Sequence, residues 1–433
     1  MRRERGELVV LVIAVLSIAT ACSLPPQVNS GGAAIAPSSL QAAWVVLGPN
    51  GVAIARVVTS GSRCPRINLD MQSFTMQVRA QPTLPDYPVL ICEMILPSGI
   101  ASAVVDGLPL PLPKTHPRRL VVIGDTGCRL KGKEAIQACN DAQAWPFESI
   151  ARSAARWQPE LVIHVGDYHY RESPCPPGNA GCAGSPWGDN WPTWKADFFA
   201  PAAELLRAAP WIVTRGNHED CNRAGQGWFR FLDPQFLSLG CQDYTPPYAV
   251  PMGEGQLLIL DSASAPDDTA PAAMVAFYGS QLAALRQASS AVAWLVTHRP
   301  IWGVGQSDGG KDGPNMFQVN ATLQAASVND LAPFITLILS GHLHLLETLS
   351  FTTGRPPQLI VGNGGTALDP AITLPLVGTE IAGATVAEGT ALDRFGFMTL
   401  ERSDHGWLGT VRDVNGNAMA RCTISNDRLT CER

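Results

Sequence analysis

The sequence predicts an α/β fold preceded by a small all-β domain. The chain has 433 residues, which is too long for one ordinary core and favours two domains. Before residue 113, short β-like segments alternate with turn residues. After residue 120, continuous apolar segments alternate with helical stretches, which is typical of a buried sheet covered by helices.

The composition is that of a globular protein without a basic surface. Hydrophobic residues make up 46% of the chain, charged residues 16%, and the formal net charge is -6. Globular proteins average about 25% charged residues, so this composition argues against disorder over most of the length. The lack of a basic excess argues against nucleic acid as a partner. A mildly acidic protein can still bind a small phosphorylated molecule where metal ions supply the positive charge.

Residues 1–22 are typical of an export signal. Three arginines precede the apolar run Leu8–Ala21, which is too short for a stable membrane span and suits a signal-peptide core. The small residues Ala19-Thr20-Ala21 fit a signal peptidase site. Together with Cys22 they resemble a bacterial lipobox, which would make Cys22 the acylated first residue. The alternative is ordinary cleavage just before Cys22.

We therefore expect an exported bacterial protein that is periplasmic, lipid-anchored at the cell surface, or secreted. Contact with a membrane is expected only through a lipid on Cys22. Residues 23–42 are rich in Ser, Pro, Gly and Ala without periodicity, which predicts a flexible tether.

The cysteines fit an oxidising compartment. Setting Cys22 aside leaves ten of the eleven cysteines, an even number that favours structural disulfides. No two close C-x-x-C pairs occur, so a zinc ribbon is not supported. Spacing alone does not fix the connectivity, but the ten fall into local pairs that would each close one loop or hairpin: 64–92, 128–139, 175–182, 221–241 and 422–431.

Residues 43–113 are predicted to form the small all-β domain. Its expected strands are Ala43–Leu47, Val52–Val58, Met71–Arg79 and Val89–Leu96. The first two flank a Gly-Pro-Asn-Gly sequence, which predicts a hairpin. The proline-rich stretch from Leu108 to Arg119 is a plausible linker.

Residues 114–433 are predicted to form the α/β domain. Its expected strands are Leu120–Ile123, Leu161–Val165, Trp211–Val213, Leu257–Leu260, Val292–Val296 and Ile335–Leu339. Its clearest helices are Glu148–Trp157, Trp194–Ala208 and Met274–Ser289. From Phe395 onward the pattern returns to strands and turns.

Potential metal ligands follow all but one of these strands. They are Asp125, Asp167 with Tyr170, Asn217 with His218, His298, and His342 with His344. In open α/β sheets, ligands bind beyond the carboxyl ends of the strands, so five loops would converge on one crevice. Carboxylates and imidazoles suit iron, zinc and manganese. His342 and His344 can point the same way in extended structure and reach two ions about 4 Å apart.

Other histidines carry weaker signals. His164 lies within a strand and is expected to be a core residue or to support the site from behind. His169 lies in the turn between Asp167 and Tyr170, so it either lines the pocket or only packs in the turn. His116 and His405 stand in polar segments without the context of a ligand.

Five sequence blocks together resemble the calcineurin-like metallophosphoesterases, and among them the purple acid phosphatases. The blocks are Gly124-Asp125-Thr126-Gly127, Gly166-Asp167-Tyr168-His169-Tyr170, Gly216-Asn217-His218-Glu219, Val296-Thr297-His298 and Gly341-His342-Leu343-His344. They span about half of the chain, in the order and spacing of that family. The resemblance implies a four-layer αββα sandwich, with residues 43–113 as the counterpart of an N-terminal fibronectin-III-like domain.

One pair of positions favours the purple subfamily. Most members carry Asp-x-His in the first block, and the histidine binds the first metal. Gly127 stands at that position here, and Tyr170 stands where purple acid phosphatases place a compensating tyrosine. The glycine-rich segment Gly362–Gly365 resembles the loop that follows the last metal block, although it can also be a simple turn.

The resemblance implies two metal ions. A ferric ion would be held by Asp125, Asp167, Tyr170 and His344. Asp167 would bridge it to a divalent iron, zinc or manganese ion, which Asn217, His298 and His342 would also bind. Phenolate and carboxylate ligands suit Fe(III).

The implied reaction is hydrolysis of a phosphate monoester by a metal-bound hydroxide, as in an acid phosphatase. Asp167 and His218 would be catalytic, with His218 protonating the leaving group or binding phosphate. Glu219 and Asp220 are expected to orient His218. The alternatives are a phosphodiesterase or nucleotidase of the same superfamily, or a surface lipoprotein with a non-catalytic phosphatase scaffold. The loop from Ser173 to Trp194 is expected to shape the pocket rim, where its tryptophans would stack on a substrate or pack the fold.

Overall fold

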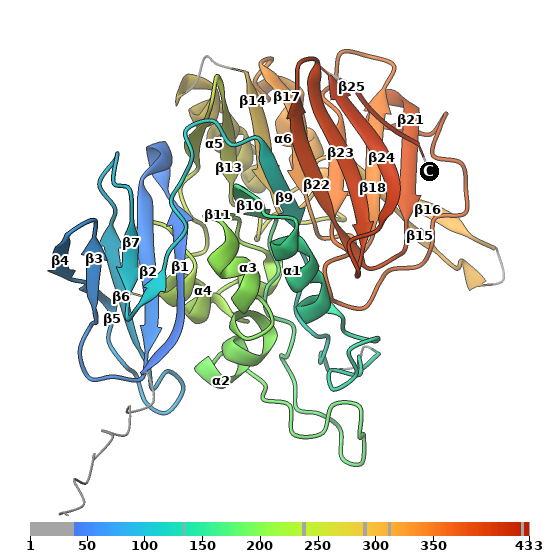
Figure 1. Ribbon diagram of the computed structural model, residues 1–433. Coiled ribbons are helices and arrows are strands. Elements are labelled where there is room, and N and C mark those ends of the chain that lie inside the picture. The colour runs from blue at the N-terminus through green and yellow to red at the C-terminus, as the bar shows by residue number, and fades with distance from the viewer. Residues whose placement is uncertain are drawn as a thin grey trace, which may run out of the picture. The chain divides into compact units, whose positions relative to one another are not determined.

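Two large β-sheets pack against each other and carry helices on their outer faces (Figure 1). The computed structural model describes residues 39–132, 135–235, 240–288, 292–310, 313–425 and 428–432. Residues from Ser38 onward group into one unit. The predicted signal peptide, Cys22 and most of the predicted tether lie outside the described residues.

The first sheet has eleven strands and contains both ends of the described chain. In spatial order they are β25 (Arg428–Glu432), β24 (Ala418–Ser425), β23 (Gly406–Asp413), β22 (Gly396–Ser403), β9 (Arg119–Ile123), β10 (Leu161–His164), β11 (Trp211–Val213), β1 (Leu40–Leu47), β2 (Ala53–Thr59), β6 (Leu90–Ile95) and β5 (Gln77–Ala80). β9, β10 and β11 are parallel to one another, whereas β22 is antiparallel to β9.

The second sheet has eight strands. In spatial order they are β12 (Tyr248–Met252), β13 (Gly255–Leu260), β14 (Ala293–Thr297), β17 (Ile335–Ser340), β19 (Gln358–Val361), β18 (Leu346–Phe351), β21 (Ala384–Leu392) and β20 (Glu380–Ile381). β13, β14, β17 and β19 are parallel. A separate hairpin joins β15 (Gly303–Ser307) to β16 (Asn315–Val319).

Three hydrophobic cores define four layers. One core lies between the sheets and includes Val122 of β9 and Val296 of β14. The opposite face of the first sheet packs against α1 (Phe147–Arg156), α2 (Trp191–Trp194), α3 (Ala203–Ala208) and α4 (Gly225–Phe231). The outer face of the second sheet packs against α5 (Ala272–Ala288) and α6 (Ala321–Asp330). The predicted αββα sandwich is therefore confirmed.

The segment before residue 113 is all-β, as expected. A four-stranded sheet joins β4 (Gln72–Thr75), β3 (Arg66–Leu69), β7 (Ala103–Val105) and β8 (Leu108–Pro109). The hairpin of β1 and β2 instead continues the first large sheet, because β1 pairs in parallel with β11. The division of the chain at residues 42 and 113 stays a prediction about independent folding.

Two expected elements differ in detail. The strand expected at Met71–Arg79 is split at Met76, whose side chain is buried, so that β4 and β5 join different sheets. The helix expected at Trp194–Ala208 is split into α2, a π-turn at Lys195–Phe199, and α3. Pro201 contributes to the break because it has no N–H to continue a helix. Among the described helices, none is both long and apolar enough to span a membrane.

Candidate metal centre

Parallel strands from both sheets bring the predicted ligands to one place. Asp125 and Asp167 lie just beyond the carboxyl ends of β9 and β10, which are neighbours in the first sheet. Asn217 begins a short 3-10 turn, Asn217–Glu219, after β11. His298 follows β14, and His342 lies just after β17, which neighbours β14 in the second sheet. The carboxyl ends of the two sheets thus supply ligands to the same site.

Tyr170 lies at the centre of the first group of ligands. Its Oη is 3.0 Å from Asp125 Oδ1, 2.9 Å from Asp167 Oδ2 and 2.9 Å from His344 Nε2. Asp125 and Tyr170 are completely buried. A phenol has one proton and can donate it to only one of these acceptors. The remaining lone pairs face one another in buried space, an arrangement that a cation between them would stabilise.

His298 shows the same requirement in the second group. Its Nδ1 is 2.9 Å from the Val165 carbonyl oxygen, which can only accept, so Nδ1 carries the hydrogen. In the neutral ring, Nε2 is then a lone pair that faces Asn217 Oδ1 at 2.9 Å and Asp167 Oδ2 at 3.2 Å. Three acceptors with no proton between them fit a bound metal ion.

The two groups share Asp167. Its Oδ2 lies 2.9 Å from Tyr170 Oη and 3.2 Å from His298 Nε2, so this carboxylate belongs to both groups. Ligand atoms of Asp167, His298 and His342 all lie within 4.8 Å of one another. The seven predicted ligands therefore come together, and their carboxylate, phenol, amide and imidazole donors suit a pair of transition metals.

Strained backbone holds three of these ligands. The φ angles of Asp125, Asp167 and His342 are 55°, 57° and 75°, in the left-handed region that non-glycine residues rarely adopt. Such conformations persist only where the surrounding structure imposes them. The main chain of the segment Gly362–Gly365 and of Thr366 packs beside Asp125, with bonds from Gly364 N to the Gly124 oxygen and from Thr366 N to the Asp125 oxygen.

Gly127 is required by close packing around Tyr170. A Cβ at this position would lie 2.8 Å from Tyr170 N, from the Tyr168 oxygen and from Asp197 Oδ2. Asp197, in the π-turn, accepts hydrogen bonds from Tyr170 N at 2.7 Å and from Cys128 N at 3.0 Å. The space that a histidine would need is thus occupied by the groups that fix Tyr170.

Carboxylates stand behind three of the site histidines, and none of them was identified from sequence. Glu172 Oε1 is 2.7 Å from His218 Nδ1, Asp369 Oδ1 is 3.5 Å from His344 Nδ1, and Asp267 Oδ2 is 3.0 Å from His342 Nε2. Arg223 also contacts His218 Nδ1 and pairs with Glu172. Of these three carboxylates, only Glu172 could have been suspected from the sequence, because it lies two residues after Tyr170.

Glu219 has a different placement from the one expected. Its carboxylate accepts hydrogen bonds from the amides of Asp167, Tyr168, His169 and Gly216, at distances from 2.8 to 3.2 Å. It therefore shapes the Asp167–Tyr170 turn, and the contact to the His218 ring comes from Glu172 and Arg223. Asp220 accepts a bond from Asn222 N instead.

His169 of the second block and His164 just before it lie behind the site. His169 is buried with its Nε2 3.0 Å from the Gly188 oxygen, so it packs under the Ser173–Trp194 loop. His164 is a core residue whose ring stacks on Tyr168 at 3.8 Å. In the same loop, Trp191 and Trp194 are buried and pack the fold, whereas Trp187 is 52% exposed.

The buried carboxyls at the centre differ in charge. Burial and the neighbouring Asp167 raise the pKa of Asp125 well above its usual range. Burial acts in the same direction on Asp167, but the positive charge of His298 and His218 in their protonated forms outweighs it and holds the pKa of Asp167 well below the usual range. Burial lowers the pKa of His218 to about 4, against the opposing effect of Asp167. A cation bound between Asp125 and Asp167 would supply the positive charge that lets both carboxyls ionise.

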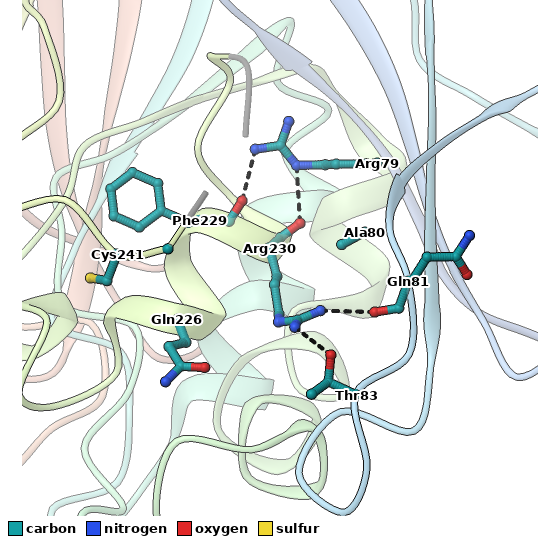
Figure 2. A pocket seen from close by; sticks show the side chains of 9 residues that line it. Arg79, Ala80, Gln81, Thr83, Gln226, Phe229, Arg230 and Cys241 are labelled. Carbon is teal, nitrogen blue, oxygen red and sulfur yellow. Dashed lines mark hydrogen bonds between the residues drawn. The ribbon is translucent and has the colours of Figure 1, made fainter. Parts of the chain in front are cut away.

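A pocket of about 450 Å³ lies apart from these ligands, between β5 and α4 (Figure 2). Its arginines are already engaged. Arg79 donates to the main-chain oxygens of Phe229 and Arg230, and Arg230 donates to the Gln81 oxygen and Thr83 Oγ1. These contacts join the β-rich segment to α4, and we assign the pocket no ligand.

Comparison with known proteins identifies one family. The model of the calcineurin-like phosphoesterase family matches residues 118–346, more than half of the chain. No curated protein matches the chain in sequence.

Two solved structures are similar in fold. A purple acid phosphatase, PPD1, from seeds of yellow lupin (Lupinus luteus) has a TM-score of 0.57 and 13% identity, with 89% of this chain and 74% of that chain covered. The structure of PhoD has a TM-score of 0.53 and 10% identity, with 92% of this chain and 93% of that chain covered. At these identities the similarity concerns the fold.

Proposed function

Because the chain belongs to the calcineurin-like phosphoesterase family, we propose that it is an exported phosphatase of the purple acid type that hydrolyses phosphate monoesters at two metal ions. The observation that carries the proposal is the position of Tyr170 Oη among Asp125, Asp167 and His344, each within 3.0 Å. Gly127 has no room for the histidine that would otherwise serve as a ligand.

Asp125, Asp167, Tyr170 and His344 would hold a ferric ion, and Asp167, Asn217, His298 and His342 a divalent iron, zinc or manganese ion. Bound there, the ions would polarise phosphate oxygens and activate the attacking water. The buried carboxylates would fix the spacing of the two ions and, through them, the position of the bound phosphate.

His218 is placed to serve the leaving group. Its Nδ1 is held by Glu172 at 2.7 Å, and its Nε2 lies on the side of Asp167, 3.8 Å from Oδ2. The ring packs on Tyr170 at 3.8 Å between centroids, which limits its rotation. Because Glu172 holds Nδ1–H, Nε2 carries a proton only in the imidazolium form, which the lowered His218 pKa of about 4 restricts to acidic solution. In acid, that proton would pass to the ester oxygen as the bond to phosphorus breaks.

We also propose that the mature protein begins at an acylated Cys22 and works outside the cytoplasm. Five disulfides link the ten other cysteines, as expected for an oxidising compartment. The mass of the mature N-terminal peptide tests this proposal, because a peptide that begins with an unmodified Cys22 would contradict acylation.

The decisive experiment combines metal analysis with turnover. Asn217→Ala and His298→Ala should each lose one ion per chain and lower kcat by more than about 100-fold, since loss of outer partners alone costs 10–100-fold. His405→Ala is the matched control, because His405 is exposed and lies outside the site. Unchanged turnover in both site variants would rule out the dinuclear assignment.

A second experiment compares the rates of hydrolysis of a phosphate monoester and a phosphate bis-ester over a range of pH. Preference for the monoester in acid supports the proposal, and preference for the bis-ester favours the phosphodiesterase alternative. Two bound ions without turnover on either ester or on nucleotides would indicate a non-catalytic scaffold.

A further inference from the structure

Asp267 lies beside the second group of ligands but comes from a part of the chain without a metal motif. It lies between β13 and α5, and its Oδ2 is 3.0 Å from His342 Nε2. Arg299, the residue after His298, donates to the same Oδ2 and places its Nη1 3.1 Å from His342 Nε2. The three side chains are mostly buried, with side-chain exposures of 25% for Asp267, 12% for Arg299 and 17% for His342.

Two contacts bear on the tautomer of His342. Its Nε2 lies 3.0 Å from Asp267 Oδ2, which accepts, and 3.1 Å from Arg299 Nη1, which donates, so a hydrogen on Nε2 would bond the carboxylate and a lone pair there would accept from the guanidinium. Because the shorter contact of Arg299 Nη1 is to Asp267 Oδ2, we assign the guanidinium hydrogen to that oxygen and a second hydrogen to His342 Nε2. In the neutral ring this leaves Nδ1 as the atom with a free lone pair.

Asp267 is itself held from behind by Asn320. Asn320 Nδ2 donates to Asp267 Oδ1 at 2.9 Å, and the Ala321 amide donates to the Asp267 main-chain oxygen at 2.8 Å. The side-chain oxygen of Asn320 accepts from Leu323 N at 2.7 Å and so caps the N-terminus of α6. Asn320 is completely buried and has a left-handed φ of 64°. Asn320 therefore has two roles, since it caps α6 and bonds Asp267, and its strained conformation persists because both contacts hold it in place.

We propose that Asp267 is a positioning residue that fixes His342 in the Nε2-protonated tautomer and thereby presents Nδ1 to the second metal ion. The proposal rests on the dinuclear site proposed above. Asp369 makes the corresponding contact at the first ion, where it meets His344 through the main-chain N at 2.8 Å and Nδ1 at 3.5 Å. The two carboxylates therefore act on different ions.

The test is a pair of metal titrations on the full mature protein. Apo protein is titrated with Zn²⁺ after the ferric site is filled, in wild type and Asp267→Asn. The variant should bind the second ion about 10- to 100-fold more weakly, while the visible absorption from Tyr170 and iron is unchanged. Asp268→Asn is the control, because Asp268 is the neighbouring aspartate and is exposed; it should match wild type.

Two further variants separate positioning from general damage. Asn320→Asp keeps the helix cap but sets a second buried carboxyl against Asp267, so the affinity for the second ion and the melting temperature of the apo protein should fall together. Asp267→Asn should lower the affinity without that fall in melting temperature. Asp369→Asn should disturb the visible absorption of the first ion instead. In ¹⁵N-histidine spectra of apo protein, the His342 signal of Asp267→Asn should move away from the Nε2-protonated tautomer.

The outcomes distinguish the inference from its premise. A wild-type protein that binds fewer than two ions would overturn the proposed function. The positioning role alone would be overturned by a different result: wild type binds two ions, and Asp267→Asn binds the second ion with the same affinity and keeps the same His342 tautomer.

Discussion

Gly127 and Tyr170 form a coupled pair at the residue scale. The main-chain nitrogen of Tyr170 would be 2.8 Å from a Cβ at residue 127, and the Tyr170 hydroxyl lies within 3.0 Å of two buried aspartates. Removal of a side chain at one position thus makes room for the segment that carries the other. This gives the subfamily pattern in the sequence a steric reason.

Gly127→Ala tests that steric reason. The added methyl meets main-chain atoms that cannot move without shifting Tyr170, so we expect a loss of about 1–3 kcal/mol in the free energy of unfolding and a weaker iron–tyrosinate band. Urea denaturation and a visible spectrum measure the two effects. Gly354→Ala is the control, because a Cβ at that glycine would meet no atom within 4 Å. A Gly127→Ala protein with full stability and an unchanged band would contradict the model of tight packing.

Tyr170→Phe tests the identity of the first ion. With Fe(III) bound, wild type should show a broad visible band from the phenolate, and the variant should lose it because the donor oxygen is gone. The fold should survive, since only the hydroxyl is removed. A colourless, iron-loaded wild type would exclude the purple subclass while leaving the phosphoesterase family intact.

Sequence reasoning identified the side chains that gather at the site but missed the groups that support them, for a physical reason. Asp125, Asp167 and His298 follow apolar strands, so topology alone brings them together. Asp267 and Asp369 lie in irregular segments, and their distance to His342 and His344 depends on loop paths that no periodicity encodes. Glu219 was recognised, but its bonds to four amides required the three-dimensional turn.

At the scale of elements, β18 contains a buried acid apart from the ligands. Glu347 has no exposed surface, its Oε2 accepts from Val304 N at 3.3 Å, and its Oε1 has no hydrogen-bond partner among the described residues. Burial raises the pKa of Glu347 to about 8. The folded protein therefore keeps this carboxyl protonated under conditions in which the unfolded chain ionises it.

The raised pKa of Glu347 predicts that the free energy of unfolding decreases as the pH rises. The stability associated with Glu347 is fully present below its unfolded pKa of about 4.3 and falls as pH rises toward the folded value of about 8. Glu347→Gln cannot ionise, so its free energy of unfolding relative to wild type should rise across that window, by an amount on the order of a few kcal/mol. Denaturant melts at pH 4.5, 6.5 and 8.5 measure it on apo protein, and a constant difference would contradict the shift.

Elements were predictable where one pattern governed them. The strands Leu120–Ile123 and Ile335–Leu339 were close to their observed bounds because continuous apolar runs at this length fit buried strands. The helix at Trp194–Ala208 was not, because the π-turn places Asp197 under Tyr170 and Gly127. That tertiary demand overrides local helix preference.

At the scale of the whole molecule, two arginines join the β-rich segment to the catalytic region. Arg56 donates to the Phe231 and Asp233 oxygens, and Arg79 to the Phe229 and Asp233 oxygens, all between 2.8 and 2.9 Å. Both also bond Glu93. These carbonyls lie in and just after α4, which follows the Asn217–Glu219 turn, so the β-rich segment supports the part of the chain that leads out of the candidate site.

Arg79→Ala should therefore destabilise the molecule as a whole. Loss of the Arg79 guanidinium leaves Glu93 with one cation fewer and several buried carbonyls without a hydrogen-bond donor. The free energy of unfolding should therefore fall by about 3–5 kcal/mol, in a single transition. Arg66→Ala is the control, because Arg66 is exposed in the same segment and bonds only Ser73. Two separate transitions would instead show that residue 113 marks a true domain boundary.

The five disulfides share a simple order with a consequence for biosynthesis. Among the ten cysteines from Cys64 onward, every bridge joins one cysteine to the next along the chain, over 7 to 28 residues. An oxidase that links thiols in the order in which they emerge would produce the native set without an isomerase. A free thiol at Cys22 would pair first with Cys64, and all five later pairs would then be shifted by one cysteine. A lipid on the Cys22 sulfur would remove that thiol and so prevent the mispairing.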